Sequence, residues 1–392
     1  MPTAIDRALT DTQRQVVELA REFARARVAP HAAAWDRSGE LPRDIVAALG
    51  ELGFLGMLAP EAHDGLGLDT VTYALALEEL ACADASVAVT VNIHAAVATS
   101  VLARHGTDEQ KARWLRPMAR GELLAAFALS EPEAGSDAAA LRTEAVADGD
   151  TWVLSGTKAW VTNGSRADLV IAFARTDTTP GAPSRGLSAF VIPTTASGYA
   201  PQPKGDTMGL RALAAVRVDL DRVRLPAVHL VGARGQGFRY AMEALELGRL
   251  GTAAQAVGLA RGALEQAVGY CAERRQFDRP LRAFEAVQFR LADMATRVEA
   301  GRGLVLAAAR ARDDGQPFGA QASMAKLFCS ETAMWVTTHA VQLFGGYGYM
   351  RDFPVEKLFR DAKATEIYEG TSEIQRLIIA RHLYADRDAA TG

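Results

Sequence analysis

The stretch TEIYEGTSEIQR, residues 365–376, decides the organisation of this 392-residue chain. Two helical patterns flank it, and Gly370 lets the backbone turn sharply between them. Thr371 is the expected N-cap of the second helix, with Glu373 in its first turn. Glu369 then lies on a tight bend beside a helix N-terminus, where the plain alternative is a solvated loop glutamate. An apolar setting would raise the pKa of its carboxyl above the usual value of about 4.3 and let it act as a base.

The composition indicates an ordinary folded protein of two or three domains. Hydrophobic residues make up 49% of the chain and charged residues 23%, which excludes a disordered or fibrous class. The net charge of −4 at pH 7 argues against nucleic acid as a partner. The cysteines (Cys82, Cys271 and Cys329) lie far apart without a CxxC pair. We therefore expect no metal site, no disulfide framework and a reducing compartment.

Neither a targeting segment nor a membrane span is expected. No apolar run reaches roughly 18 residues, and the N-terminus lacks an apolar or Arg/Ser-rich leader pattern. Instead, a T-x-x-Q capping box at Thr10–Gln13 begins the first helix almost at once. We expect a cytoplasmic protein or a processed organellar matrix form, with no membrane partner.

The hydrophobic periodicity changes twice and predicts a mainly α fold with a central β domain. Residues 1–122 form a helical domain, with helices expected at 10–28, 42–53, 70–84, 86–105 and 108–119. Residues 123–231 form a β domain, with a hairpin turn at Asp148-Gly149, a surface loop at 176–186, and strands at 151–162, 170–175, 187–193 and 216–220. Residues 232–392 form a bundle, with helices expected at 238–274, 284–313, 319–343, 354–363 and 371–385.

The stretch at 86–106 is apolar almost all round, which predicts a buried helix. His94 within it has no second histidine or carboxylate at metal-ligand spacing. We therefore expect His94 to be a hydrogen-bonded core residue rather than a ligand.

Five separated motifs resemble the acyl-CoA dehydrogenase family. They are FALSEPEAGSD (127–137), GTKAWVTNG (156–164), ERRQF (273–277), QLFGGYGY (342–349) and IYEGTSEIQR (367–376), in the order that the family shows. The stretch LGRLGTAAQAVGLA (247–260) and the last motif are similar to the short-chain, butyryl-type members. The resemblance covers essentially the whole chain. It implies an N-terminal helical domain, a middle β-barrel or sandwich and a C-terminal four-helix bundle.

The resemblance also implies an FAD-dependent dehydrogenase of acyl-CoA. Removing hydrogen across Cα–Cβ of a thioester needs a base for the α proton and an acceptor for the β hydride, and no side chain accepts hydride. In the family, the glutamate at the position of Glu369 is the base and flavin N5 is the acceptor. The backbone N–H of that glutamate and a flavin hydroxyl polarise the thioester carbonyl. Some relatives carry the base on an earlier helix, at the position of Gly248 here, which cannot serve.

The cofactor contacts come from the same resemblance. Trp160 would pack on the flavin ring, and Thr162 and Ser130 would hydrogen-bond its polar edge. Without the resemblance, Trp160 would be a strand core aromatic and Thr162 an ordinary strand threonine. The expected contacts are Phe127, Leu129, Ser130, Ser136, Trp160, Thr162, Arg274, Gln276, Phe277, Gln342, Gly345, Gly346, Thr371 and Glu373.

Some of these contacts are expected to reach the cofactor of a neighbouring subunit. They are Arg274, Gln276, Gln342 and the Gly345-Gly346 turn, and an arginine facing a pyrophosphate is a sensible pairing. The alternative for Arg274 is a solvated charged face. A shared cofactor site implies at least a dimer, and the family is usually tetrameric.

The expected substrate contacts are four. Gly370 lies where the thioester chain approaches the backbone, and Ser136 lies near the CoA part of the substrate. Glu246 and Arg249, three residues apart on one helical face, resemble a pair that contacts the CoA portion.

The sequence departs from the family pattern at several positions. Glu133 and Asp278 replace glycines, and Glu285 stands where a cofactor-contacting glutamine is common. Leu213 and Ala215 replace customary hydroxyl residues. These changes put tight FAD retention in question but leave the base untouched.

The sequence therefore predicts α,β-dehydrogenation of a short- or medium-chain acyl thioester, with electrons passed to an electron-transfer flavoprotein. One alternative is a flavin oxidase, similar to acyl-CoA oxidase or to nitroalkane oxidase, although the latter would carry Asp in place of Glu369. Another is a non-catalytic, DNA-associated member, which the charge of −4 disfavours. Chain length, and CoA or a carrier protein as the thioester carrier, stay open.

Overall fold

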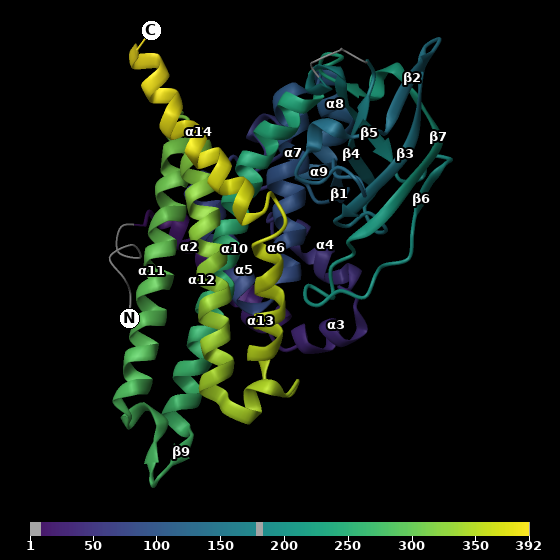
Figure 1. Ribbon diagram of the computed structural model, residues 1–392. Coiled ribbons are helices and arrows are strands. Elements are labelled where there is room, and N and C mark those ends of the chain that lie inside the picture. Colours follow the sequence, from purple (N-terminus) through teal and green to yellow (C-terminus); the bar gives the residue numbers. More distant parts are fainter. Residues whose placement is uncertain (1–8, 178–182, 392) are drawn as a thin grey trace.

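The computed structural model describes residues 9–177 and 183–391, in which two helical regions flank a β domain (Figure 1). This is the mainly α fold with a central β domain that the sequence predicted. The predicted loop at 176–186 falls partly on residues 178–182, which lie outside the described residues.

The N-terminal region is a series of closely connected helices. Its capping box is present, because the Thr10 side chain accepts the Gln13 N–H and the Gln13 side chain accepts the Thr10 N–H. The short α3 was not predicted, because its seven residues span too few turns to show a helical period. The elements are α2 (Asp11–Phe23), η1 (Ala24–Val28), α3 (Ala32–Ser38), α4 (Arg43–Glu51), α5 (Thr70–Ala83), α6 (Ala85–Val91), η3 (Asn92–Ala98), α7 (Thr99–His105), α8 (Asp108–Gln110), η4 (Lys111–Leu115) and α9 (Arg116–Ala119).

The helical stretch Ala85–His105 is long and apolar enough to cross a membrane by length and composition. The expectation that no segment has this character was therefore wrong. However, 94% of its most apolar window is buried inside the protein, as expected for a helix that is apolar all round. His94 within it accepts the Ala125 N–H at 2.9 Å and donates to the Met118 carbonyl at 3.1 Å. It is the core histidine that the sequence predicted, and burial lowers its pKa to about 4.

The middle region is an eight-stranded sheet of order β6-β7-β3-β2-β4-β5-β8, with β1 pairing in parallel with β4. The predicted hairpin joins β2 and β3, with Asp148 opposite Thr151. Residues of β3 and β7 meet those of β4 and β5 in one apolar core, so the two halves of the sheet cover each other. The strands are β1 (Ala125–Ala128), β2 (Glu144–Asp148), β3 (Thr151–Val161), β4 (Leu169–Arg175), β5 (Leu187–Pro193), β6 (Tyr199–Pro201), β7 (Val216–Pro226) and β8 (Leu230–Val231).

Four of these strands were not predicted. Strands β1, β6 and β8 have four residues or fewer, too few to show a period of two. Strand β2 has only one buried residue among its five. Their places are set by pairing with partner strands rather than by local pattern.

The C-terminal region is built around α10, which packs against α5, α11, α12 and α13. The helices match the predicted ranges to within two residues, except that the last one continues beyond 385. They are α10 (Gly237–Glu273), α11 (Glu285–Asp313), α12 (Gly319–Phe344), α13 (Pro354–Thr365) and α14 (Ser372–Thr391), and the hairpin β9 (Arg275–Gln276) and β10 (Arg279–Pro280) joins α10 to α11 at the bottom of Figure 1.

Helices from both ends of the chain share one apolar core. Leu77 of α5, Val91 of α6, Leu250 of α10 and Val336 of α12 have no exposed surface and belong to the same cluster. The sheet has a cluster of its own. The two helical regions therefore stabilise each other, and the site described next lies where they meet.

Candidate active site

The segment between α13 and α14 carries the glutamate that the sequence singled out. Glu369 has a φ of 56° and Gly370 a φ of 90°, so the backbone passes through the left-handed region twice. A glutamate rarely adopts this conformation, and it persists only where surrounding contacts hold it. Thr371 Oγ1 accepts the Ile374 N–H at 3.4 Å, in the position of the expected N-cap. The predicted tight bend is confirmed.

Glu369 is half-buried, and one oxygen of its carboxylate is buried without a hydrogen bond. Its Oε2 has no hydrogen-bond partner among the described residues. Burial raises the pKa of this carboxyl to about 7, although the positive charges of Arg249 and Lys326 oppose the shift. A carboxyl with this pKa is ionised in part at neutral pH and can take up a proton, which is the behaviour of a general base.

Gly248 of α10 leaves the space that this carboxylate occupies. A Cβ at position 248 would lie 2.7 Å from Glu369 Oε2 and 2.9 Å from Val97 Cγ2. By the family resemblance, some relatives carry their catalytic glutamate at the position of Gly248. In this chain positions 248 and 369 face each other. The carboxylate of Glu369 therefore occupies the space beside Gly248.

Arg249 and Glu246 lie on the same helix but in different surroundings. Arg249 is only 7% exposed, its Nε has no hydrogen-bond partner among the described residues, and it interacts electrostatically with Glu369. Burial lowers the pKa of Arg249, and the charges of Glu369 and Glu246 oppose that shift. Glu246 is half-buried, which raises its pKa, and its carboxylate lies against Gly319 at the start of α12. The structure therefore brings Arg249 to the base.

Upstream of the bend, buried ion pairs fix α13 to the rest of the molecule. Lys357 contacts Asp361 at 2.6 Å on its own helix and Asp84, the N-cap of α6, at 2.8 Å. The Asp361 carboxylate also accepts the Leu210 N–H of the β domain at 2.6 Å. One cluster therefore joins all three regions of the chain.

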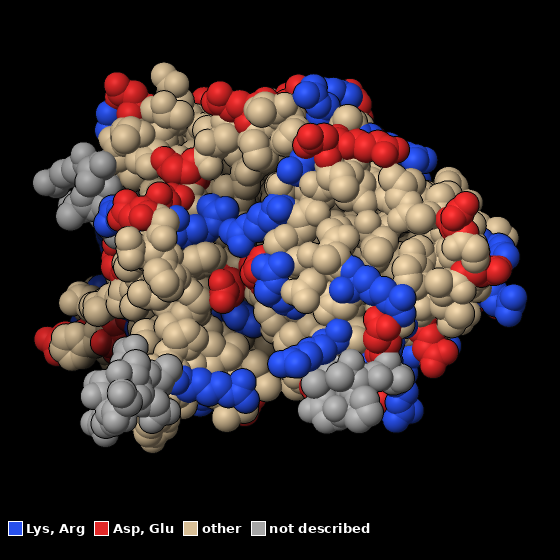
Figure 2. All heavy atoms as spheres, turned by 90° about the horizontal axis from the view of Figure 1, so that it is seen from above, with Lys and Arg blue, Asp and Glu red and all other residues tan. Residues whose placement is uncertain are grey.

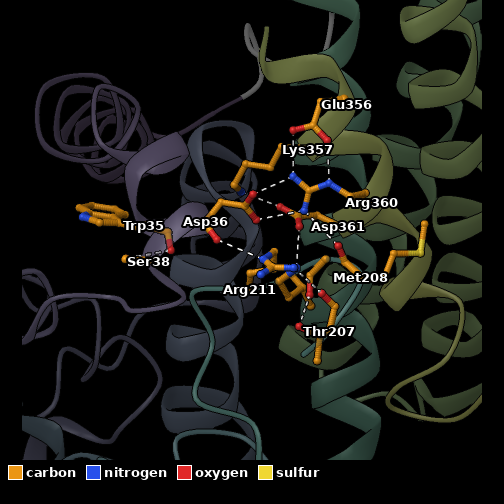
Figure 3. Close-up of polar contacts among 12 residues, drawn as sticks. Trp35, Asp36, Ser38, Thr207, Met208, Arg211, Glu356, Lys357, Arg360 and Asp361 are labelled. Atoms are coloured by element: carbon orange, nitrogen blue, oxygen red, sulfur yellow. Dashed lines mark hydrogen bonds and ion pairs between the residues drawn. The ribbon is translucent and has the colours of Figure 1, made fainter. Parts of the chain in front are cut away.

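A second cluster lies beside the first on the same helix (Figure 3). The Arg360 guanidinium contacts Asp36 of α3 and Glu356, each at 2.7 Å, and donates to the Met208 carbonyl at 3.0 Å. Arg211 donates to the Asp36 carbonyl at 3.2 Å. The helix that leads into Glu369 is thus held rigidly before the bend begins.

Trp160 on β3 is exposed rather than buried in the sheet. Its exposed fraction is 75% and its φ is 57°, at the point where the β3–β7 register shifts between Lys158 and Val161. Interpretation as a core aromatic is therefore wrong. Thr162 is half-buried two residues on. The Trp160 side chain therefore leaves a flat apolar face uncovered by the described residues.

Residues 129–131, which follow β1, lie next to the Trp160 indole. The Ala159 N–H donates to the Ser130 carbonyl at 2.9 Å. The buried Lys158 ammonium donates to the Leu129 carbonyl at 3.1 Å and to Glu131 at 2.8 Å. Half-buried Ser130 is therefore held beside Trp160. The sequence analysis had placed both residues at the flavin.

A second group of predicted residues gathers far from the base. Arg274, Gln276, Gln342, Gly345 and Gly346 line a pocket of about 500 Å³ at the C-terminal end of α10. Positions 249 and 274 are roughly 37 Å apart along the helix axis. These residues form one site, but it is not the site of Glu369 in the same chain.

Another cavity, of about 460 Å³, lies between α2, α3, α10 and α13. Arg21, Arg261 and Phe353 line it, and no predicted site residue does. Glu369 does not line this cavity.

Comparison with known proteins now decides the family. The acyl-CoA dehydrogenase N-terminal, middle and C-terminal domain models match residues 10–122, 126–223 and 235–384. The acyl-CoA dehydrogenase of Bacillus subtilis (strain 168) is 43% identical over 374 residues, which are 95% of this chain and 98% of that protein. This chain belongs to the acyl-CoA dehydrogenase family.

Several members of the acyl-CoA dehydrogenase family are similar over nearly their whole length. The mitochondrial short-chain specific acyl-CoA dehydrogenase of Bos taurus is 43% identical over 375 residues, which are 96% of this chain and 90% of that protein. The butyryl-CoA dehydrogenase of Megasphaera elsdenii superposes with a TM-score of 0.94 at 40% identity, covering 96% and 99% of the two chains. A chain from a structure of the electron transferring flavoprotein of Acidaminococcus fermentans does so with a TM-score of 0.94 at 42% identity, covering 96% and 98%.

Two other acyl-CoA dehydrogenase-like structures bear on the cofactor and the carrier. A glutaryl-CoA dehydrogenase of Mycobacterium smegmatis in complex with FADH2 has a TM-score of 0.92 at 31% identity, covering 97% and 96%. The prolyl acyl carrier protein oxidase AnaB has a TM-score of 0.92 at 32% identity, covering 96% and 100%.

Acyl-CoA dehydrogenases are FAD-dependent, so FAD is the cofactor of this chain. The residues fit a flat ring, because the uncovered indole of Trp160 lies beside Ser130 and Thr162. Phe127 is half-buried with its ring 5.0 Å from that of Phe173, and Leu129 is buried. The other expected cofactor contacts are exposed or half-buried, and their individual roles stay predictions: Ser136, Arg274, Gln276, Phe277, Gln342, Gly345, Gly346, Thr371 and Glu373.

The departures from the acyl-CoA dehydrogenase pattern have structural consequences. Glu133 contacts Arg142 at 2.6 Å, and both side chains are exposed, so its extra charge has a partner. Asp278 adopts a φ of 63° in the turn between β9 and β10. Glu285 is exposed at the first position of α11.

Sequence reasoning missed the residues that contact the Glu369-Gly370 bend and its neighbour Tyr368. Lys326 and Gln375 donate to backbone carbonyls of the bend, and Gln255 accepts from the Tyr368 hydroxyl at 2.7 Å. A lysine inside the run ASMAKLFC of α12 was the one available signal, because a charge on an apolar helix face needs a partner.

Proposed function

We propose that this chain dehydrogenates a short- or medium-chain acyl-CoA, straight or branched, to the trans-2-enoyl-CoA, with Glu369 as the base for the α proton. The observation that carries the proposal is the buried Glu369 Oε2, which has no hydrogen-bond partner among the described residues. With a pKa of about 7, this carboxyl accepts a proton from a carbon acid better than a solvated glutamate does.

The residues of the bend have separate tasks in this reaction. The backbone N–H of Glu369 makes no hydrogen bond to another described residue, so it can donate to a thioester carbonyl beside the base. Gly370 presents backbone without a side chain, and Gly248 leaves room for the carboxylate. FAD, when bound, supplies the acceptor for the β hydride.

Close helix packing beside the base supports a short acyl chain. The Tyr73 hydroxyl donates to Asn92 Oδ1 at 2.8 Å, and Asn92 Nδ2 donates to the Gly248 carbonyl at 3.2 Å. A Cβ on Gly251 would lie 2.2 Å from Asn92 Oδ1, so α10 and η3 touch at this level. A long apolar tail would have to part these helices, and the names of the relatives point to the same length class.

The charge around the molecular surface supports CoA as the carrier. Seen from above, Lys and Arg side chains gather around a hollow between the C-terminal helices and the β domain (Figure 2). CoA carries phosphate groups, which such cations attract. A carrier-protein thioester is the second candidate, because the oxidase AnaB acts on an acyl carrier protein substrate by name.

We propose an electron-transfer flavoprotein as the electron acceptor, which the structure from Acidaminococcus fermentans supports. The competing proposal is direct oxidation by O2, as in an oxidase. Mixing the substrate-reduced enzyme with air-saturated buffer separates the two, since an oxidase recovers its yellow colour within the turnover time and a dehydrogenase does not.

A homo-oligomer, expected to be a tetramer, completes the proposal. Large apolar side chains are exposed on the outer faces of α10, α11, α12 and α14: Val268, Phe289, Leu304, Met324, Leu377 and Tyr384. The pocket around Arg274 is about 37 Å from the base along α10, which supports its use by the cofactor of a second copy. Sedimentation of the flavin-loaded protein tests the assembly, and a monomer would contradict it.

Anaerobic titration with acyl-CoAs of graded length tests the whole proposal by bleaching of the flavin. We expect short chains to bleach the flavin most completely and Glu369→Gln to abolish bleaching while the flavin stays bound. The same titration with the acyl group on a carrier protein tests the second candidate. Bleaching at the wild-type rate by Glu369→Gln would refute the role of the base.

A further inference from the structure

Lys326 is a completely buried cation whose ammonium contacts the bend that carries the base. It lies on the inner face of α12 with no exposed surface, and its Nζ donates to the Gly370 carbonyl at 2.8 Å. Burial lowers its pKa to about 8. A buried lysine is costly unless it has compensating partners, so its presence calls for a reason.

Hydrogen bonding alone does not supply that reason. The Gln375 amide also donates to the Gly370 carbonyl, at 2.8 Å, and to the Glu369 carbonyl at 3.1 Å. Gln375 has no exposed surface either. A neutral donor therefore already satisfies the bend carbonyls, and what Lys326 adds is a positive charge.

That charge faces the base. Glu369 makes the largest electrostatic contribution to stabilising the Lys326 ammonium, and Glu366 and Glu373 contribute less. The positive charge of Arg249 destabilises the ammonium. Seen from Glu369, the charged and titratable groups on the packed elements are Arg249 of α10, Lys326 of α12 and Tyr73 of α5. Lys326 is the one of these that also holds the backbone of the bend.

We propose that Lys326 is a positioning residue for the dehydrogenation, which fixes the left-handed Glu369-Gly370 bend through the Gly370 carbonyl and keeps the Glu369 carboxylate ionised through its charge. The inference rests on the proposed role of Glu369 as the base. Lys326 contacts the bend rather than the reacting atoms, so it acts only through Glu369.

The test is the pH dependence of flavin bleaching by a short acyl-CoA in anaerobic stopped-flow experiments. Removing a cation near a carboxylate raises its pKa, typically by about 1 unit or more at close range. We expect Lys326→Met to move the acid limb of the bleaching rate up by about 1 pH unit and to lower the plateau rate about tenfold. Lys326→Arg should restore the acid limb, since it keeps the charge.

Two further variants separate charge from hydrogen bonding and from packing. Lys326→Gln keeps a donor for Gly370 without the charge, so its acid limb should move as far as that of Lys326→Met. Ser323→Ala, at a buried position one turn earlier on α12, is the matched control and should keep the wild-type profile. Flavin absorbance and thermal melting confirm that each variant is loaded and folded.

The outcomes distinguish this inference from the proposed function. Wild-type acid limbs in both neutral variants, with Glu369→Gln inactive, would overturn the role of Lys326 and leave the base in place. In another outcome, neither neutral variant folds or retains flavin, whereas Lys326→Arg folds and retains flavin but has an altered acid limb. That outcome would assign Lys326 a purely structural role and would also overturn the inference. An active Glu369→Gln would remove the proposed function itself.

Discussion

Two carboxylates, one within α13 and one just beyond it, have opposite hydrogen-bond surroundings. Within the helix, Asp361 has no exposed surface, but its oxygens accept from Lys357 and from the Leu210 N–H, both at 2.6 Å. Just beyond the helix, Oε2 of half-buried Glu369 is also buried, yet it has no partner among the described residues. One carboxylate ties three regions together, and the other is left free to react.

The difference teaches that burial alone does not identify a reactive carboxylate. Burial raises the pKa of Asp361 as it does that of Glu369, so the direction of the shift is the same at both sites. The hydrogen-bond inventory separates them, because a fully paired carboxylate serves stability and an unpaired oxygen in an apolar setting can take a proton. The ion pairs of Asp361 hold α13 in place, and Glu369 beyond the helix keeps an oxygen without a partner among the described residues.

The largest expected effect comes from removing the free oxygen. Glu369→Gln should lower turnover about 10⁴-fold, the upper range for loss of a general base, with the flavin spectrum unchanged. Single-turnover bleaching measures it. Glu366→Gln, on the same bend and half-buried, is the control and should keep most of the activity.

The next largest effect is expected when Lys357 is removed from its buried ion pairs with Asp84 and Asp361. Lys357→Met leaves Asp84 and Asp361 buried without their cation, and we expect a loss of about 3–5 kcal/mol in the free energy of unfolding. Urea unfolding measures it. Lys363→Met removes a more exposed partner of Glu366 on the same helix and should cost less than about 1 kcal/mol. Equal losses in the two variants would contradict the comparison.

A pH series sharpens the contrast in stability. The folded pKa of Glu369 is about 7, above its unfolded value of about 4.3, so the native state binds the extra proton between these values. Stability from this group is full below about pH 4 and is lost as pH rises through 7, by up to about 4 kcal/mol. The difference in unfolding free energy between Glu369→Gln and wild type should grow over this window. A constant difference would show that the carboxyl is not raised.

Filling the space at the base tests its position. Gly248→Ala places a Cβ 2.7 Å from Glu369 Oε2, and displacing a reacting group by about 1 Å can cost about 10²-fold in rate. Gly269→Ala, on the same helix with no atom within 4 Å of the new Cβ, is the control. It should keep wild-type turnover and gain up to about 1 kcal/mol in stability.

The smallest effect is expected at the surface. Glu133→Gly removes an exposed ion pair with Arg142, which should change the free energy of unfolding by less than about 1 kcal/mol. We expect FAD affinity, measured by fluorescence of released flavin, to rise slightly as the negative charge is lost. A large drop in affinity would show that Glu133 itself supports the cofactor.

Features set by local pattern could be predicted from the sequence. The capping box at Thr10, the hairpin at Asp148-Gly149 and the bend at Gly370 each depend on neighbours a few residues apart. The family motifs then singled out Glu369 and Trp160 of β3, whose roles as base and flavin contact stay predictions. Short strands such as β6 could not be predicted, because three residues show no period.

Contacts between distant residues were beyond local reasoning. Lys357 meets Asp84 from 273 positions away, and Lys326 meets Gly370 from 44 positions away. Each residue alone resembles an ordinary helix lysine. Only the packing of α12 and α13 against the earlier helices shows which groups these lysines contact.

The shared core of the two helical regions has a consequence for synthesis. The stretch Ala85–His105 is covered in part by α10, which begins at Gly237 and leaves the ribosome much later. At about 5–20 residues per second, this delay is on the order of 10 s. During that time a helix apolar enough to enter a lipid bilayer has no permanent cover, so a nascent chain arrested before α10 should be a strong client for chaperones.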